Sequence, residues 1–99
     1  MKYFFCKLLP PRSDFVQTMT ADEGLLMQEH AAYWKRVMDR GLTAAFGLVA
    51  DPAGAFGVGI LTLPDDGDAR ALTLGDPTIK ANVGFSYQIY PMPRAVTRP

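Results

Sequence analysis

Only one segment of the chain has the length and apolar periodicity of a long helix, and it runs from Thr20 to Gly41. Thr20, followed three residues later by Glu23, is a capping box and predicts where the helix begins. Gly41 directly after a basic residue is typical of a helix end. At about 100° per residue, one side of this helix is apolar and the opposite side is charged. The apolar arc holds Leu26, Met27, His30, Trp34 and Val37, and the polar arc holds Gln28, Lys35, Arg36 and Asp39.

His30 lies in the middle of the apolar arc and is the only histidine of the chain. An ionisable group that points into a core needs a polar partner. Imidazole titrates near neutral pH and is well suited to moving protons. Two interpretations stay open: a core histidine that hydrogen-bonds a backbone carbonyl, and a functional histidine. If the protein performs chemistry, we expect it to run through His30.

The apolar stretches outside this helix predict strands. Two of them form a hairpin, because Asp51-Pro52-Ala53-Gly54 between them is a favourable turn sequence. Prolines end the first and the last stretch, namely Pro10 and Pro11 and then Pro91 and Pro93. The four predicted strands are Lys2–Leu9, Thr43–Ala50, Ala55–Leu63 and Phe85–Tyr90.

The segments between the strands complete the order of elements. After the first strand we expect a polar loop with Phe15 as its one large apolar anchor. The acidic run Asp65–Asp68 favours the start of a second, short helix that continues to Leu74. Gly75-Asp76-Pro77 then ends this helix and begins another helical turn.

This order, strand–helix–strand–strand–helix–strand, predicts a ferredoxin-like α+β fold. We expect one domain over residues 1–99, with a four-stranded antiparallel sheet and both helices on one face. The strand Lys2–Leu9 is apolar on both sides, so the other face of the sheet also needs a cover. A second copy packed sheet against sheet would supply it, which predicts a two-fold homodimer or an assembly of such dimers.

Composition and charge exclude several classes of function. Ten basic and ten acidic residues cancel, so we expect no nucleic-acid partner and no membrane partner. No segment has the length of a membrane span or the pattern of a signal peptide. One histidine and one cysteine do not make a metal cluster, and we expect no metal and no cofactor. The single Cys6 rules out an internal disulfide and favours a reducing, cytoplasmic location.

Asp76 is the second candidate for chemistry. Its place before Pro77 makes it a helix N-cap, which by itself explains the residue structurally. A capping aspartate still has a second oxygen to offer to a histidine. A carboxylate in that position fixes the imidazole tautomer and stabilises the imidazolium ion. We therefore expect the side chains of His30 and Asp76 to meet in the folded chain.

Five further residues are candidates for a substrate pocket. Gly57 and Gly59 share one face of their strand, where either a ligand or a tightly packed helix would approach. Tyr33 and Trp34 lie near His30 and are either core residues or a substrate clamp. Arg12 is the only charge placed to reach over such a pocket, or else an ordinary exposed loop arginine.

The combination of these features resembles the YciI-like (YCII-related) family across essentially the whole chain. The resemblance rests on LLPPRSDF, MQEHAAYW and GDP, and on PMPRA after the last strand. It implies a dimeric α+β barrel with a pocket near a histidine and an aspartate, which here are His30 and Asp76. One type of relative is a dehydrochlorinase that acts on a chlorinated hydroxyhydroquinone through proton transfer by such a pair.

Three hypotheses for function follow. The first is a cofactor-free enzyme of lyase, dehydrochlorinase or isomerase type, in which His30 and Asp76 act on a small cyclic or aromatic compound. In it, Tyr33, Trp34 and the glycine face shape the pocket, and Arg12 holds an anionic or phenolic oxygen. The second is a non-catalytic protein that binds a small ligand or serves as an accessory subunit. The third is a cofactor-free monooxygenase of the dimeric α+β barrel type.

Overall fold

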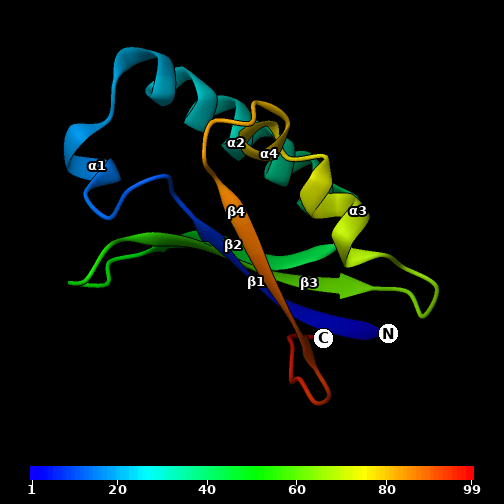
Figure 1. Cartoon of the computed structure of the whole chain (residues 1–99). Coiled ribbons are helices and arrows are strands. Elements are labelled where there is room, and N and C mark those ends of the chain that lie inside the picture. The colour runs from blue at the N-terminus through cyan, green and yellow to red at the C-terminus, as the bar shows by residue number, and fades with distance from the viewer.

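Four antiparallel strands form a single sheet in the order β2-β3-β1-β4. The computed structural model describes all of residues 1–99. All helices lie on one face of the sheet, as Figure 1 shows, so the predicted ferredoxin-like α+β fold is confirmed. The strands are β1 (Lys2–Leu9), β2 (Thr43–Val49), β3 (Phe56–Leu63) and β4 (Ser86–Met92). The helices are α1 (Phe15–Thr18), α2 (Ala21–Asp39), α3 (Ala69–Leu74) and α4 (Pro77–Lys80).

The long helix α2 begins where the sequence predicts. The Glu23 amide donates to Thr20 Oγ1 at 3.1 Å, and the Thr20 amide donates to Glu23 Oε1 at 2.9 Å. Both bonds of the capping box are therefore present. The helix ends before Gly41, whose φ of 78° is the left-handed conformation that glycine adopts without strain. These two ends fix which residues of α2 face the sheet.

Two details of the sequence interpretation are wrong. The predicted polar loop contains the short helix α1, with a buried Phe15. The last strand does not stop at Pro91 but continues to Met92, with Pro91 opposite Phe4. Strand β4 is at the edge of the sheet, where a residue without an N–H costs little because the outer side has no partner strand.

The core lies between the sheet and α2. Its fully buried members are Cys6, Trp34, Val37, Leu61, Leu63 and Ala69. Because side chains alternate along a strand, the residues of β1 that share the face of Cys6 point towards the helices. Leu8 is one of them, and the residues directly opposite Cys6 and Leu8 on β3 are Gly59 and Gly57. The two glycines therefore lie on the helix-covered face of the sheet.

No helix covers the opposite face of the sheet. Phe5, Ile60 and Tyr90 are paired across three strands on this face, and the rings of Phe5 and Tyr90 lie 6.1 Å apart. The C-terminal segment curls on this side of the sheet (Figure 1). Its residues bound a surface hollow together with Tyr3 and Ile60. Most of this open face is therefore an apolar surface without a covering layer.

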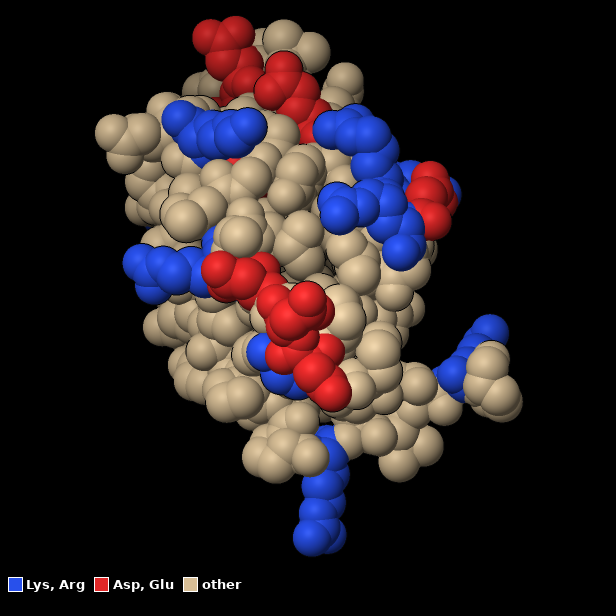
Figure 2. Space-filling model, turned by 90° about the vertical axis from the view of Figure 1, so that its right-hand side faces the viewer, with Lys and Arg blue, Asp and Glu red and all other residues tan.

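Charged side chains of both signs are interspersed over the face of the molecule drawn in Figure 2. This mixed pattern agrees with a formal net charge of zero. None of the helices is long and apolar enough to cross a membrane.

Candidate functional site

Asp76 is held in place by its own helical turn. It is the N-cap of α4, and its Oδ1 accepts a hydrogen bond from the Thr78 amide at 2.9 Å. Pro77 occupies the first position of the helix, as the Asp-Pro sequence predicts. The side chain is 0% exposed. The cap therefore uses one carboxylate oxygen and directs the other, Oδ2, towards α2.

His30 meets this second oxygen, as predicted. Its Nδ1 lies 2.8 Å from Asp76 Oδ2, although the two residues are 46 positions apart in the sequence. A carboxylate only accepts hydrogen bonds, so Nδ1 is the donor. In the neutral imidazole, Nε2 is then the basic nitrogen. Asp76 thus selects the tautomer of His30 and leaves Nε2 free to exchange a proton.

Two more donors converge on the same oxygen. Trp34 Nε1 donates to Asp76 Oδ2 at 2.8 Å, and the Tyr87 hydroxyl donates to it at 2.5 Å. Trp34 Nε1 also lies 3.1 Å from the Tyr87 oxygen. Sequence reasoning missed Tyr87, which it placed in the last strand without assigning it a role. The available signal was its hydroxyl, because a tyrosine that faces a core needs a polar partner.

These bonds keep Asp76 ionised. Burial alone would raise the pKa of its carboxyl group, but hydrogen bonds from His30, Tyr87 and Trp34 outweigh burial and lower the pKa to about 2. Burial and the neighbouring carboxylate raise the pKa of Tyr87 well above its ordinary value of 10.0. Tyr87 therefore stays protonated as a hydrogen-bond donor, and the site contains a lasting negative charge beside the imidazole.

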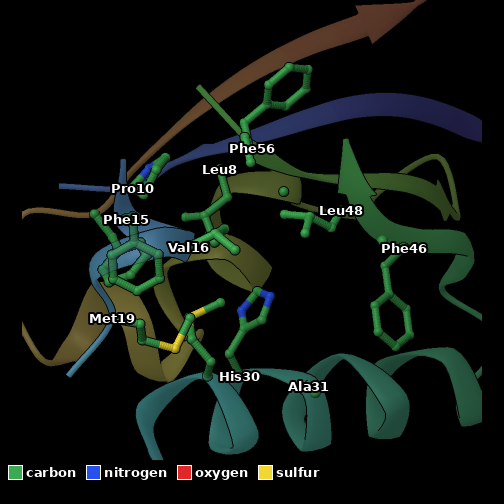
Figure 3. Close-up of a pocket in the computed structure, with 15 residues that line it drawn as sticks. Leu8, Pro10, Phe15, Val16, Met19, His30, Ala31, Phe46, Leu48 and Phe56 are labelled. Carbon is green, nitrogen blue, oxygen red and sulfur yellow. The ribbon is translucent and has the colours of Figure 1, made fainter. Parts of the chain in front are cut away.

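The imidazole of His30 reaches into a cavity of about 310 Å³ between α2 and the sheet (Figure 3). This volume is at the small end of the range for ligand sites. His30 has the only lining side chain that contains nitrogen or oxygen. The lining residues are Leu8, Pro10, Phe15, Val16, Met19, Met27, His30, Ala31, Phe46, Gly47, Leu48, Ala55, Phe56, Gly57 and Phe85.

A second, small cavity of about 20 Å³ adjoins the same histidine. Gly57 and Gly59 both line it, together with Trp34 and Tyr87. A Cβ atom built on Gly59 would meet nothing within 4 Å. Gly59 therefore leaves open space beside His30, whereas a Cβ atom on Gly57 would lie 3.2 Å from Leu8 Cβ.

Arg12 and Tyr33 lie away from the large cavity. Arg12 makes a bidentate ion pair with Glu23, with nitrogen–oxygen distances of 2.7 and 2.8 Å. The Tyr33 hydroxyl donates to the Leu72 carbonyl at 2.7 Å, and its ring packs edge-on against Trp34. Of the seven residues proposed from the sequence, the structure brings five around one site: His30, Asp76, Trp34, Gly57 and Gly59.

Comparison with known proteins identifies the family. The YCII-related domain matches residues 4–93, which is nearly the whole chain. The chain belongs to the YCII-related domain family. A search of curated proteins found no match for this YCII-related protein.

Among solved structures, the YCII-related chain is similar to a formyltetrahydrofolate deformylase from Pseudomonas putida KT2440. The sequences are 13% identical, and the TM-score is 0.44. The alignment covers 91% of this chain but only 28% of the deformylase.

The remaining ionisable groups of this YCII-related domain form no metal-binding cluster. No group of three or more His, Cys, Asp and Glu side chains is arranged to hold a metal ion. Burial raises the pKa of Cys6 to about 11, so its thiol stays protonated in the core. The chemistry that the residues offer is concentrated at His30.

Proposed function

We propose that this YCII-related protein is a small enzyme of lyase or isomerase type, in which His30 is the general acid and base. The substrate is a small cyclic or aromatic compound held in the cavity of about 310 Å³. One observation carries the proposal. Nδ1 of His30 is bound by a buried carboxylate, while the ring stands at the wall of an apolar cavity.

His30 Nε2 performs the proton transfer in this proposal. In an isomerisation, Nε2 removes a proton from one substrate atom and returns it to another. In an elimination, Nε2 removes a proton from carbon while the leaving group departs with the bonding electron pair, and the proton is later released to water. Both reactions are redox-neutral and balance without an added oxidant.

Asp76 supports each proton transfer without itself being protonated. Its carboxylate holds Nδ1 as the donor and stabilises the imidazolium ion that forms when Nε2 takes a proton. With a pKa of about 2, the carboxylate remains charged at neutral pH. Trp34 and Tyr87 keep the carboxylate in position through their hydrogen bonds to Oδ2.

The protein acts as a homodimer in this proposal. The apolar face that contains Phe5, Ile60 and Tyr90 has no covering layer, and Tyr90 is 50% exposed. A second copy packed against it would bury this face. The cavity beside His30 lies on the opposite side of the sheet, so dimerisation leaves it accessible.

Deuterium exchange tests the proposed base without knowledge of the natural substrate. The compound 2-tetralone is a cyclic ketone with acidic protons beside its carbonyl group. In D₂O, the wild-type protein should accelerate exchange of these protons, followed by NMR. His30→Gln should lose the acceleration, and Asp76→Asn should lower it by about 100-fold or more, as expected when the orienting group is lost.

The control is a measurement of 2-tetralone binding to His30→Gln. It separates loss of binding from loss of proton transfer. Acceleration that survives in His30→Gln would contradict the role of His30. Binding of 2-tetralone by the wild-type protein without accelerated exchange would contradict the enzyme proposal. That result is what a non-catalytic binding protein would give.

A further inference from the structure

We infer that the cavity beside His30 selects an uncharged, largely apolar ring with a single polar group, which faces Nε2 of His30. The inference rests on the proposed site but requires no turnover. It concerns which molecules bind, whereas the proposed function concerns what happens to them.

The wall of the cavity is almost entirely apolar. Apart from the imidazole of His30, its side chains contain no nitrogen or oxygen. A carboxylate or phosphate that entered this cavity would lose its hydration and find no free cation. Protonated His30 does not supply one, because its charge is already paired with Asp76 at 2.8 Å.

Arg12, which the sequence analysis considered as a holder of an anionic oxygen, is engaged outside the cavity. Both of its terminal nitrogens bind Glu23, and its Nε binds Thr18 Oγ1 at 2.7 Å. Hydrogen bonds from Arg12 lower the pKa of Glu23 to about 2, so the ion pair persists at neutral pH. The guanidinium is therefore engaged at the junction of α1 and α2 and does not line the cavity.

The backbone of β3 beside the cavity offers no free hydrogen-bonding groups. Strand β3 is paired at Gly57 on both sides, with Leu8 of β1 and Leu48 of β2. Its backbone N–H and C=O groups are thus used within the sheet. Additional hydroxyl groups of a ligand that face β3 would therefore find no backbone partner there.

The apolar lining of the cavity contains several aromatic rings. Phe15, Phe46 and Phe85 contribute aromatic rings to the wall, and Figure 3 shows the first two near His30. Aromatic walls favour flat ring ligands through large contact areas. The cavity therefore fits a ring that presents one hydroxyl or carbonyl group to the imidazole.

Three naphthalene derivatives test this inference by calorimetry near neutral pH. They share one ring system and differ in polarity: 2-naphthol, 2-naphthoate and 2,3-dihydroxynaphthalene. We expect 2-naphthol to bind at least about tenfold more tightly than either of the others, because only it leaves no charge or hydroxyl unpaired.

Two neighbouring alanines of α2 provide the matched variants. Ala31 lines the cavity and Ala32 does not. Both are exposed positions in the middle of the helix, and leucine is nearly as good a helix former as alanine. Ala31→Leu should therefore weaken 2-naphthol binding by about tenfold or more through lost space. Ala32→Leu should leave it unchanged.

Three outcomes would overturn the inference. Equal or tighter binding of 2-naphthoate or the diol would show that the cavity accepts charge or several polar groups. Absence of 2-naphthol binding at millimolar concentration would contradict the ligand class. If Ala31→Leu left the affinity for 2-naphthol unchanged, the ligand would bind outside this cavity. Tight 2-naphthol binding without exchange of 2-tetralone protons would contradict the proposed function alone.

Discussion

His30 and Trp34 lie four residues apart on α2 and contact the same oxygen of Asp76, each at 2.8 Å. Residues at this spacing share one face of a helix. The aspartate is therefore held by two nitrogens whose separation is fixed by the helix backbone. The Trp34 contact persists whatever the protonation state of His30, because an indole N–H is always a donor.

Replacing Trp34 with phenylalanine removes this donor and keeps an aromatic ring in the core. We expect the pKa of Asp76 to rise from about 2 towards its ordinary value of 3.8. The free energy of unfolding should fall by about 1–2 kcal/mol, as for other lost buried hydrogen bonds. NMR titration of the Asp76 carboxyl carbon and urea denaturation followed by circular dichroism measure both effects. An unchanged carboxyl titration would show that Trp34 does not influence Asp76.

Stability should depend on Asp76 at acidic pH. Its pKa is lower in the folded protein than its ordinary value of 3.8, so its ionisation stabilises the fold above that pH. This contribution is lost as the pH falls through about 2. Asp76→Asn should cost about 3 kcal/mol at neutral pH, because it leaves a buried network without its charge.

The difference in unfolding free energy between the wild type and Asp76→Asn should therefore shrink as the pH falls towards 2. Denaturant titrations across this pH range measure it. Glu23, whose pKa is also about 2, titrates in the same range but is present in both proteins, so it cancels in the comparison. A difference that stays constant with pH would contradict the assignment to Asp76.

Two glycines should respond in opposite ways to alanine. A Cβ atom at Gly59 meets nothing within 4 Å, so Gly59→Ala should leave the protein as stable or up to about 1 kcal/mol more stable. A Cβ atom at Gly75 would lie 2.5 Å from the Tyr33 hydroxyl oxygen. Gly75→Ala should therefore cost about 1–3 kcal/mol by overpacking. Thermal unfolding measures the stability of both variants. Equal changes in stability for Gly59→Ala and Gly75→Ala would contradict this prediction.

The open face of the sheet should mediate dimerisation. Light scattering should give about twice the chain mass of 10.9 kDa, with about 800 Å² or more buried per subunit. Ile60→Arg places a charge at the centre of this face and should shift the mass towards that of the monomer. Exposed Gln28, on the polar side of α2, provides the control Gln28→Arg. A monomeric wild-type protein at micromolar concentration would rule out the dimer.

Loss of the capping box should weaken α2 without altering the cavity. Thr20→Ala removes the acceptor of the Glu23 amide and should cost about 1 kcal/mol. Gln28→Ala within the same helix should stay within about 0.5 kcal/mol of the wild type. Urea denaturation compares them, and an unchanged stability in Thr20→Ala would mean that the cap contributes nothing.

The sequence predicted those parts of the site that depend on local signals. The capping box at Thr20 sets the rotation of α2, and the Asp-Pro pair sets the orientation of Asp76. Given the strand order, these two signals were sufficient to place His30 beside Asp76. Local patterns of this kind are read directly from neighbouring residues, because they depend on backbone hydrogen bonds within one turn.

The missed features depend on contacts between distant segments. Tyr87 contributes because β4 lies beside β1 and faces Asp76, which its own strand pattern does not reveal. Arg12 is engaged by Glu23, eleven residues later, through a bidentate geometry. Pro91 fits inside a strand only because that strand is at the sheet edge. These three features become apparent only once the three-dimensional structure is known.

The position of Tyr87 on the last strand links the site to the order in which the chain is made. His30, Trp34 and Asp76 all precede β4, but the carboxylate receives its third donor only when that strand pairs with β1. A chain shortened before Tyr87 would lack one of the three donors to Asp76 Oδ2. The pairing of β4 with β1 therefore completes both the sheet and the hydrogen bonds of Asp76.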